Sequence, residues 1–303
     1  MAINRRSFLR RSATGLAVAG LASQLPLSWQ LFAATPAKLN ISLAQWSLHR
    51  QLRSGQLKVL DFAVKTRRDF QLDAVEYVNQ FFADKANDQT FLRQLKQRAD
   101  DNGVRSLLIM VDAEGDLAAI DAVQRQQAIE NHYKWVEAAA FLGCHAIRVS
   151  IADHATTEAL QMQQAAVDGL QRLAAFAAPY GISVIVENHM GHSMDANWLA
   201  AVLQQTQAGN IGSLPDFGNF SGDKYQGMQL LLPFAKGVSA KSYAFDDNGA
   251  ESSIDYQRMW QLIQAAGYQG YIGIEYEGEN ADEDAGIRAT RDLLRAVAAQ
   301  AGR

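Results

Sequence analysis

The sequence predicts an α/β protein, and within that class a closed (β/α)8 TIM barrel, from three observations. Short apolar segments alternate with helical segments eight times along the chain, which is typical of a parallel sheet covered by helices. About 265 residues follow the N-terminal segment, a usual length for eight such units. The competing doubly wound open sheet needs a glycine-rich phosphate turn, and the sequence contains neither G-x-G-x-x-G nor a Walker A motif.

Each strand is predicted where apolar and β-branched residues run up to a turn, and residues 182–186 are the clearest case. The expected strands are 40–46, 73–78, 104–111, 145–150, 182–187, 211–216, 238–243 and 271–276. The expected helices are 57–70, 89–101, 117–142, 156–180, 195–206, 227–232, 254–266 and 283–299. Glycine is favoured between a helix and the next strand because it adopts positive φ at low cost. Four glycines stand at such places: Gly103, Gly143, Gly181 and Gly267.

Residues 1–34 are expected to be an export signal that precedes a barrel domain at 38–303. Arg5 and Arg6 are followed by Ser-Phe-Leu, two further arginines and a stretch without charge that ends at Lys38. A basic segment followed by an apolar one is typical of secretory signals. The arginine pair resembles the twin-arginine (Tat) signal, which implies export by the Tat translocase to the periplasm. An uncleaved membrane anchor is the alternative, because the uncharged stretch is long enough to span a bilayer.

The composition narrows the class of partner. Without residues 1–34 the chain loses four arginines and no acid, so its formal net charge changes from −4 to −8. Phosphate contacts need Lys and Arg, so we expect no nucleic-acid partner. The single cysteine, Cys144, excludes an internal disulfide, and its apolar neighbours predict a buried, inert thiol. A homo-oligomer remains open.

Three acids end predicted strands: Glu187, Asp216 and Glu275 end the fifth, sixth and eighth. TIM barrels keep their active site at this end of the strands. Converging buried carboxylates repel one another, and a divalent cation removes that repulsion. Carboxylates suit Mg²⁺ or Mn²⁺, whereas added imidazoles shift the choice toward Mn²⁺, Co²⁺ or Zn²⁺. The alternative is that each acid caps a helix or pairs with Arg148 or Lys241.

Other side chains near strand ends are candidates for substrate binding. The ring of Trp46 suits the face of a sugar, with core packing as the alternative. Arg148 suits an anionic substrate or pairs with an acid, and Glu76 binds a substrate hydroxyl or forms a salt bridge inside the barrel. The complete set of substrate-binding candidates is Trp46, His49, Glu76, Asn79, Arg148 and His192.

Four motifs resemble the metal-site segments of the xylose isomerase-like superfamily of sugar isomerases and epimerases. They are V-E-N-H at 186–189, P-D-F-G-N at 215–219, A-K-S at 240–242 and G-I-E-Y-E-G at 273–278. In the family's ketose 3-epimerases, Glu, Asp, His and Glu hold a metal, and the two glutamates also shuttle the proton. The resemblance therefore implies the metal ligands Glu187, Asp216 and Glu275, with Glu187 and Glu275 as the catalytic acid–base pair.

The chain departs from this family pattern on the seventh strand. The family usually has His-x-Lys-Asp there, and this chain has Ser239-Ala240-Lys241-Ser242. A neutral serine hydroxyl is a weak metal ligand. Two interpretations follow. His189 lies two residues beyond Glu187, so strand alternation would aim both side chains the same way and make His189 a ligand. Alternatively, catalytic Lys241 supplies the positive charge, in a cluster with weak or no metal.

The expected function is a divalent-metal-dependent isomerase or epimerase that acts next to a carbonyl of an unphosphorylated sugar or keto-sugar. Glu187 and Glu275 would move the proton by way of an enediolate. If a β-group leaves instead, the same site is a lyase or dehydratase on keto-glycosides or keto-polyols. An alternative from another class is a non-catalytic periplasmic carbohydrate-binding barrel. A nuclease like endonuclease IV, which shares the barrel, would need more histidine ligands and a basic surface.

Overall fold

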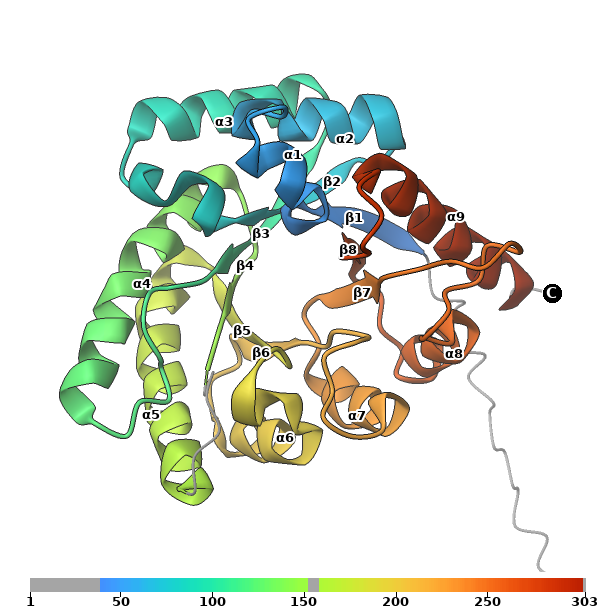
Figure 1. The fold of residues 1–303 in the computed structure, drawn as a ribbon. Helices are drawn as coiled ribbons and strands as arrows, with labels where there is room; N and C mark the ends of the chain where they lie inside the picture. The colour runs from blue at the N-terminus through green and yellow to red at the C-terminus, as the bar shows by residue number, and fades with distance from the viewer. Residues whose placement is uncertain (1–38, 152–157, 302–303) are drawn as a thin grey trace, which may run out of the picture. The chain divides into compact units, whose positions relative to one another are not determined.

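The computed structural model describes residues 39–151 and 158–301, and it confirms the predicted TIM barrel (Figure 1). Eight parallel strands form one sheet in the order β6-β5-β4-β3-β2-β1-β8-β7. The end strands of this order, β6 and β7, are joined by two parallel bridges, Ser213–Ala235 and Asp216–Ser239. The amide of Phe217 donates a hydrogen bond of 3.0 Å to the carbonyl oxygen of Ser239. These contacts close the barrel.

The strands and helices have the following bounds. The strands are β1 Asn40–Ala44, β2 Ala74–Val78, β3 Arg105–Val111, β4 Ala146–Val149, β5 Ser183–Glu187, β6 Ile211–Leu214, β7 Val238–Ser242 and β8 Tyr271–Tyr276. The α-helices are α1 His49–Arg53, α2 Phe62–Phe70, α3 Gln89–Asp101, α4 Ala122–Leu142, α5 Ala159–Ala177, α6 Ala196–Gln205, α7 Lys224–Leu231, α8 Tyr256–Ala265 and α9 Glu283–Ala301. The 3-10 helices are η1 Gln45–Leu48, η2 Val59–Asp61, η3 Asn79–Lys85, η4 Ala178–Tyr180, η5 Gly191–Met194 and η6 Leu232–Phe234.

Local capping explains where the helix bounds differ from those predicted. The helix predicted from residue 117 begins at Ala122, because the Asp121 side chain accepts hydrogen bonds from the amides of the first turn. Asp223 does the same for α7, which therefore begins three residues before the predicted start. Gly143 has a φ of 80° and ends α4 in the left-handed conformation. The predicted signal, 1–34, lies outside the described residues.

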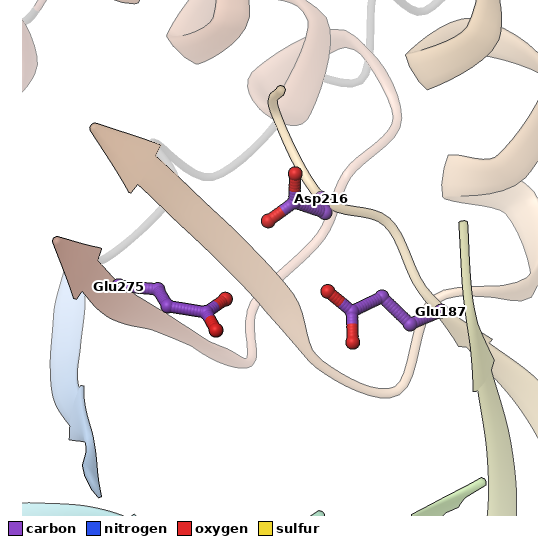
Figure 2. Close-up of side chains that lie close together, drawn as sticks. All are labelled: Glu187, Asp216 and Glu275. Carbon is purple, nitrogen blue, oxygen red and sulfur yellow. The ribbon is translucent and has the colours of Figure 1, made fainter. Parts of the chain in front are cut away.

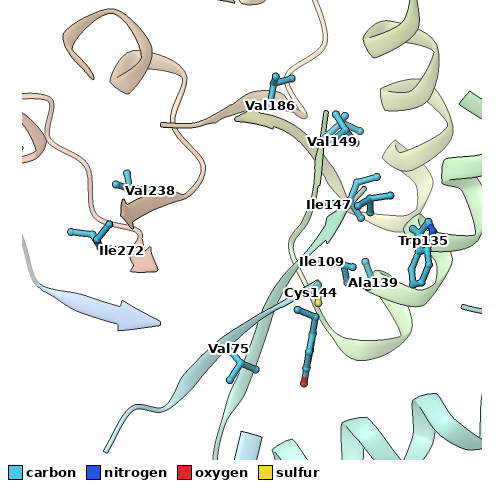
Figure 3. Packing of buried hydrophobic residues seen from close by; sticks show 14 of the residues in the cluster. Val75, Ile109, Trp135, Ala139, Cys144, Ile147, Val149, Val186, Val238 and Ile272 are labelled. Carbon is cyan, nitrogen blue, oxygen red and sulfur yellow. The ribbon is translucent and has the colours of Figure 1, made fainter. Parts of the chain in front are cut away.

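Apolar residues form two layers, one outside the sheet and one inside the barrel. The outer layer lies between the strands and the helices, and Figure 3 shows part of it around Trp135 of α4. The buried Cys144 belongs to this layer, and burial raises the pKa of its thiol. The inner cluster consists of Ala44, Val78, Leu108, Met110, Ala146, Ile185 and Leu214.

Strand alternation turns this inner cluster into the base of a polar site. Residues two apart on a strand face the same side. Three polar residues lie two positions beyond members of this cluster: Glu187 beyond Ile185, Asp216 beyond Leu214 and Arg148 beyond Ala146. These polar side chains are therefore expected inside the barrel, one step nearer the C-terminal ends of the strands. No helix in the described parts of the chain is both long enough and apolar enough to cross a membrane.

Candidate active site

Three buried carboxylates, Glu187, Asp216 and Glu275, meet inside the barrel, and we call them the carboxylate trio. Each offers one oxygen atom, and these atoms all lie within 4.8 Å of one another. Figure 2 shows the three side chains pointing toward a common centre from β5, the end of β6 and β8. Their side chains are almost inaccessible, since the residues are 2%, 0% and 4% exposed.

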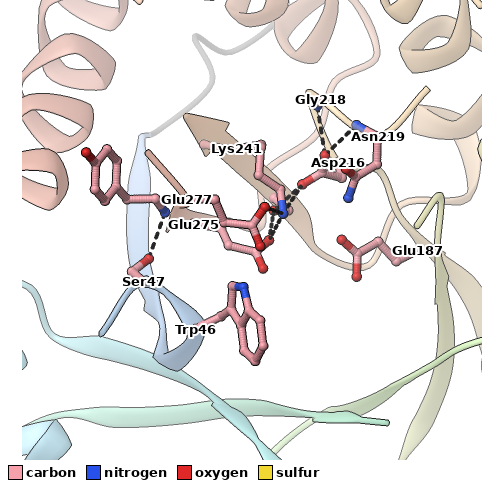
Figure 4. Close-up of polar contacts among 12 residues, drawn as sticks. Trp46, Ser47, Glu187, Asp216, Gly218, Asn219, Lys241, Glu275 and Glu277 are labelled. Atoms are coloured by element: carbon pink, nitrogen blue, oxygen red, sulfur yellow. Dashed lines mark hydrogen bonds and ion pairs between the residues drawn. The ribbon is translucent and has the colours of Figure 1, made fainter. Parts of the chain in front are cut away.

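Two residues of β7, Ser239 and Lys241, contact Asp216 and Glu275. The Ser239 Oγ lies 2.7 Å from Asp216 Oδ2 and 2.8 Å from Glu275 Oε2. The Lys241 Nζ lies 3.7 Å and 3.2 Å from the same two oxygens, and 3.2 Å from an oxygen of Glu277 (Figure 4). Lys241 is 1% exposed. The serine that replaces the family's histidine thus donates a hydrogen bond to the trio, and a buried ammonium group stands beside it.

Glu187 has a different partner, Arg148 of β4. The Nε of Arg148 lies 2.9 Å from Glu187 Oε2, and its Nη1 lies 2.5 Å from Asp112 Oδ1. The contact with Glu187 is an ion pair that lacks hydrogen-bond geometry. Neither oxygen of Glu187 accepts a hydrogen bond from any residue that the structure describes. Arg148 is 3% exposed, so this pair is shielded from bulk water.

The charges around the trio do not cancel. Two cations, Arg148 and Lys241, contact five carboxylates: Glu187, Asp216, Glu275, Asp112 and Glu277. Buried carboxylates in excess are costly unless another positive charge compensates them. The clustered oxygens and the bare Glu187 carboxylate therefore fit a bound divalent cation. The donor set of the trio is oxygen only, which suits Mg²⁺ or Mn²⁺.

The acids of the trio differ in their affinity for protons. Burial raises the pKa of Glu187 well above its usual value, and the attraction of Arg148 does not offset it. Burial likewise raises the pKa of Asp216 to about 6, against the attraction of Lys241. Burial acts in the same direction at Glu275, but there Lys241 and the Ser239 hydroxyl outweigh it and lower the pKa. The trio therefore combines one readily ionised acid with two that hold protons more tightly.

A cavity of about 300 Å³ opens beside the trio. Glu275 and Glu277 line one wall, and the indole of Trp46 lies next to them (Figure 4). Arg148 and His189 also line the cavity. Its other described lining residues are Val78, Gln80, Met110, Asp112, Ala113, Ser150 and Met190. The size suits a small molecule of the size of a monosaccharide.

Four of the predicted substrate-binding residues line the cavity or support residues that line it. Trp46 and Arg148 line the cavity. His49 stacks on Trp46 with ring centroids 5.2 Å apart, and its Nδ1 lies 2.8 Å from the Trp46 carbonyl oxygen. Asn79 exchanges two hydrogen bonds of 2.9 Å with the backbone of Asp112. His49 and Asn79 therefore support lining residues and are not among the described residues of the cavity wall.

Glu76 and His192 are not among the described residues that line the cavity. Glu76 is buried within the barrel, where Ser42 Oγ donates a 2.6 Å hydrogen bond to it. Gly273 leaves the room that this carboxylate needs, because a Cβ there would come within 2.5 Å of Glu76 Oε1. Burial raises the pKa of Glu76 to about 7. The ring of His192 stacks on Trp198, with centroids 5.6 Å apart.

His189 lines the cavity but is not in the group of mutually close ligand atoms found among the described residues. Burial and then the nearby Arg148 lower its pKa to about 4, so its imidazole is neutral at pH 7. The buried Nδ1 has no hydrogen-bond partner among these residues. This geometry favours a hydrogen bond to a molecule in the cavity, and it leaves the trio without an imidazole ligand.

Two acids at the cavity wall, Asp112 and Glu277, were not among the predicted site residues. Asp112 comes directly after β3 and Glu277 directly after β8. The rule that selected the trio, a polar residue at a strand end, also selects both. What the sequence did not indicate is that each acid pairs with a buried cation.

The family of this chain is clear from comparison with known proteins. The family model described as "Xylose isomerase-like TIM barrel" matches residues 67–297, and the chain belongs to this family. The motifs of the trio lie within the matched region.

Solved structures of two epimerases and a dehydratase share the fold at low sequence identity. The apo form of the Escherichia coli 3-keto-D-glucoside 4-epimerase YcjR is 15% identical, covers 86% of this chain and 100% of its own, and has a TM-score of 0.68. The D-psicose 3-epimerase of Clostridium cellulolyticum H10, solved with D-tagatose, is 14% identical with coverages of 86% and 99% and a TM-score of 0.69. The probable 3-DHS dehydratase AsbF of Bacillus anthracis is 17% identical, with 85%, 99% and 0.66.

A curated relative matches a short segment. The 3'-dehydrocarminate deglycosidase alpha subunit of a Microbacterium species is 33% identical over 61 residues, which are 20% of this chain and 18% of the relative. The chain therefore matches less than a fifth of that relative's length. The family model and the solved structures together show the fold of the xylose isomerase-like TIM barrel family.

Proposed function

We propose that this protein is a divalent-metal-dependent isomerase or epimerase that moves a proton next to the carbonyl of an unphosphorylated keto-sugar. The observation that carries the proposal is the carboxylate trio beside a monosaccharide-sized cavity. Glu187 and Glu275 come from strands on different sides of the barrel and converge at one centre (Figure 2). Two acids so placed can remove a proton and return one.

In the proposed mechanism, Glu187, Asp216 and Glu275 hold the cation. When bound, a divalent cation supplies Lewis-acid polarisation of a carbonyl group. One of Glu187 and Glu275 removes the α-proton, and the other returns a proton to the opposite face. Trp46 and His189 contact the substrate at the cavity wall. The apolar floor of Val78 and Met110 excludes water from the reacting atoms.

The charge of the cavity wall supports a neutral substrate. Arg148 is the one cation among the described lining residues, and it is already paired with Asp112 and Glu187. Asp112, Glu275 and Glu277 line the same wall and would repel a phosphate group. We therefore propose a keto-sugar or keto-glycoside, a class that the name of the 3-keto-D-glucoside 4-epimerase also contains.

Solvent-deuterium exchange tests the proposal. The purified protein, supplied with Mn²⁺ or Mg²⁺, is incubated in D₂O with a panel of 3-keto-glucosides and ketoses, and exchange at the α-carbon is followed by NMR. Exchange is expected in the wild type and should be lost in Glu187→Gln and in Glu275→Gln. Glu130→Gln on the exposed face of α4 is the matched control and should exchange at the wild-type rate.

Two results contradict the proposal. If exchange survives in Glu187→Gln, the catalytic role of this residue is wrong. If the wild type binds keto-sugars but exchanges no proton, the protein is a carbohydrate-binding barrel. Metal content, measured by elemental analysis of the purified protein, tests the cation independently of turnover.

A lyase is the second candidate, favoured by the names of two relatives, a dehydratase and a deglycosidase. The same proton removal from a 3-keto-glycoside would then be followed by departure of the group at the β-position. Product analysis separates the two outcomes. An epimerase returns a keto-glycoside of the same mass, whereas a lyase releases the aglycone or water and leaves an unsaturated sugar.

We extend the proposal to location and partners. The arginine pair and uncharged stretch of residues 1–34 support export by the Tat translocase to the periplasm. A fusion of these residues to a reporter that requires Tat export tests this, and a double Lys substitution of Arg5 and Arg6 should block it. A homo-oligomer is also proposed and is tested by light scattering.

A further inference from the structure

We propose that Asp112 and Glu277 are positioning residues that hold the two proton-transferring glutamates through buried cations. The site contains two chains of ion pairs. Each chain of ion pairs runs from an acid on the cavity wall through a buried cation to a glutamate of the trio. One chain is Asp112–Arg148–Glu187, and the other is Glu277–Lys241–Glu275. The inference rests on the proposed function, because it assigns these residues a part in that reaction.

The first chain is anchored at its outer end. Asp112 Oδ1 lies 2.5 Å from Arg148 Nη1, and Asp112 Oδ2 accepts a 2.9 Å hydrogen bond from Gln80. The backbone of Asp112 is fixed by two hydrogen bonds with the Asn79 side chain, one donated by the Asn79 amide group and one donated by the Asp112 backbone N–H. The side chain of Asp112 is 17% exposed, whereas that of Arg148 is 4% exposed. The anchoring thus passes from the wall of the cavity to a buried guanidinium group.

The position of Glu187 depends on this chain of ion pairs because its carboxylate has few other contacts with polar groups. Arg148 Nε at 2.9 Å is its ion-pair partner, and no described residue donates a hydrogen bond to either of its oxygens. When a carboxylate accepts no hydrogen bond, the attraction of the neighbouring cation determines its position. Arg148 in turn is held between two acids, so the loss of Asp112 would leave it free to move toward Glu187.

The second chain has the same order of exposure. Glu277 lies on the cavity wall with its side chain 29% exposed, and Lys241 behind it is 1% exposed. Lys241 Nζ is equally distant, 3.2 Å, from an oxygen of Glu277 and from Glu275 Oε2 (Figure 4). Without Glu277 the ammonium group would lose one of the acids that fix it. Glu275 has a second support, the Ser239 hydroxyl at 2.8 Å, which Glu187 lacks.

The isosteric variants Asp112→Asn and Glu277→Gln test the inference in the full-length protein. Both keep the shape of the side chain and remove its charge. We expect kcat for α-proton exchange to fall about 100-fold in Asp112→Asn, because a small displacement of a reacting group has an effect of this order. We expect a smaller loss, about 10-fold, in Glu277→Gln, since Ser239 still holds Glu275. KM should change by less than about 3-fold in both variants. A general loss of structure would instead change KM together with kcat.

A double-mutant cycle tests the chains without using turnover. Asp112→Asn, Glu187→Gln and their combination are compared in urea unfolding. The two changes should be non-additive because both residues pair with Arg148. Glu277→Gln and Glu275→Gln should behave alike through Lys241. Asp168→Asn is the matched control, because Asp168 pairs with Arg125 and Arg172 in the outer helix layer, and its exchange rate should equal that of the wild type.

The outcomes separate this inference from the proposed function. If the wild type exchanges protons but Asp112→Asn keeps kcat within about 2-fold, Asp112 has no positioning role. If the unfolding changes are additive, the chain through Arg148 does not exist. If the wild type exchanges no protons, the proposed function fails and with it the assignment to that reaction, while the cycles still show whether each acid is coupled to its glutamate.

Discussion

The two glutamates of the carboxylate trio lie in unlike surroundings. On the β7 side, Glu275 has an ammonium group at 3.2 Å and a hydroxyl at 2.8 Å. On the β4 side, Glu187 has a guanidinium group at 2.9 Å and no hydrogen bond from a described residue. Burial acts against ionisation on both sides, yet the pKa of Glu275 is lowered and that of Glu187 is raised. The difference arises because Lys241 and the Ser239 hydroxyl, with a further attraction from Arg148, outweigh burial at Glu275, whereas Arg148 does not outweigh it at Glu187.

A nearby positive charge does not by itself keep a buried carboxylate ionised. Charge and hydrogen bonding act together at Glu275, and charge acts without hydrogen bonding at Glu187. The result is a pair of acids with unlike proton affinities in one site, which is the arrangement that acid–base catalysis needs.

The largest effect is expected from Lys241→Met. The substitution leaves Glu275, Asp216 and Glu277 without their shared cation. Removal of one partner from a buried ion pair typically costs about 3–5 kcal/mol, and we expect the upper end of this range. Urea unfolding followed by circular dichroism measures the loss. Lys96→Met is the control, because the Lys96 side chain lies on the solvent side of α3 and is 40% exposed, and it should cost less than about 1 kcal/mol. A loss at position 241 no larger than that of the control would contradict the description of the β7 side.

Arg148→Met should cost less than Lys241→Met, at the lower end of about 3–5 kcal/mol. Glu187 already binds protons readily, so it can become neutral when Arg148 is lost. Asp112 is partly exposed and can be solvated. The same unfolding measurement compares the two variants. Equal losses would mean that the two sides of the site do not differ as described.

Glu76→Gln should stabilise the protein at high pH. Glu76 is a buried acid whose pKa burial raises from 4.5 to about 7, so the acid contributes stability below pH 4.5 that is lost as the pH rises through 7. At pH 8 the variant should be more stable by roughly 3 kcal/mol, since one pKa unit corresponds to about 1.4 kcal/mol. At pH 4 this gain should vanish. Urea unfolding at both pH values measures it, and a pH-independent difference would show that the effect is not one of charge.

Ser239→Ala should have the smallest effect on stability. It removes the hydroxyl that reaches Asp216 and Glu275 but leaves Lys241 in place, and one unmade buried hydrogen bond costs about 1–3 kcal/mol. Ser242→Ala is the matched control on the same strand, because its hydroxyl bonds to Thr290 away from the trio. Both variants should lose similar stability, and the proton-exchange rate should fall in Ser239→Ala alone. An equal fall in both would place the effect in the strand and not in the trio.

Much of the fold and of the trio could be predicted from local patterns. The alternation of strands and helices and the glycines after helices indicated the barrel, and Gly143 indeed adopts a φ of 80°. The position of an acid at the end of an apolar strand indicated Glu187, Asp216 and Glu275. These patterns are reliable because strand alternation and barrel topology apply to every unit in the same way.

The partners of these acids could not be predicted in the same way. The strand-end rule also fits Asp112 and Glu277, but it carries no information on the distance from each acid to its cation, which lies 36 residues away in the sequence in both cases. His189 follows the alternation rule but is absent from the trio, because the loop after β5 sets its direction.

The sequence by itself determined the barrel, its eight units and the three acids at its centre, because hydrophobic periodicity and strand ends are local properties. The tertiary structure alone decided how those acids are compensated. Closure of β6 against β7 brings Ser239 to Asp216, and the packing of β7 against β8 brings Lys241 to Glu275. Electrostatic energy depends on distances of a few ångströms between residues far apart in the chain, and only the folded barrel sets those distances.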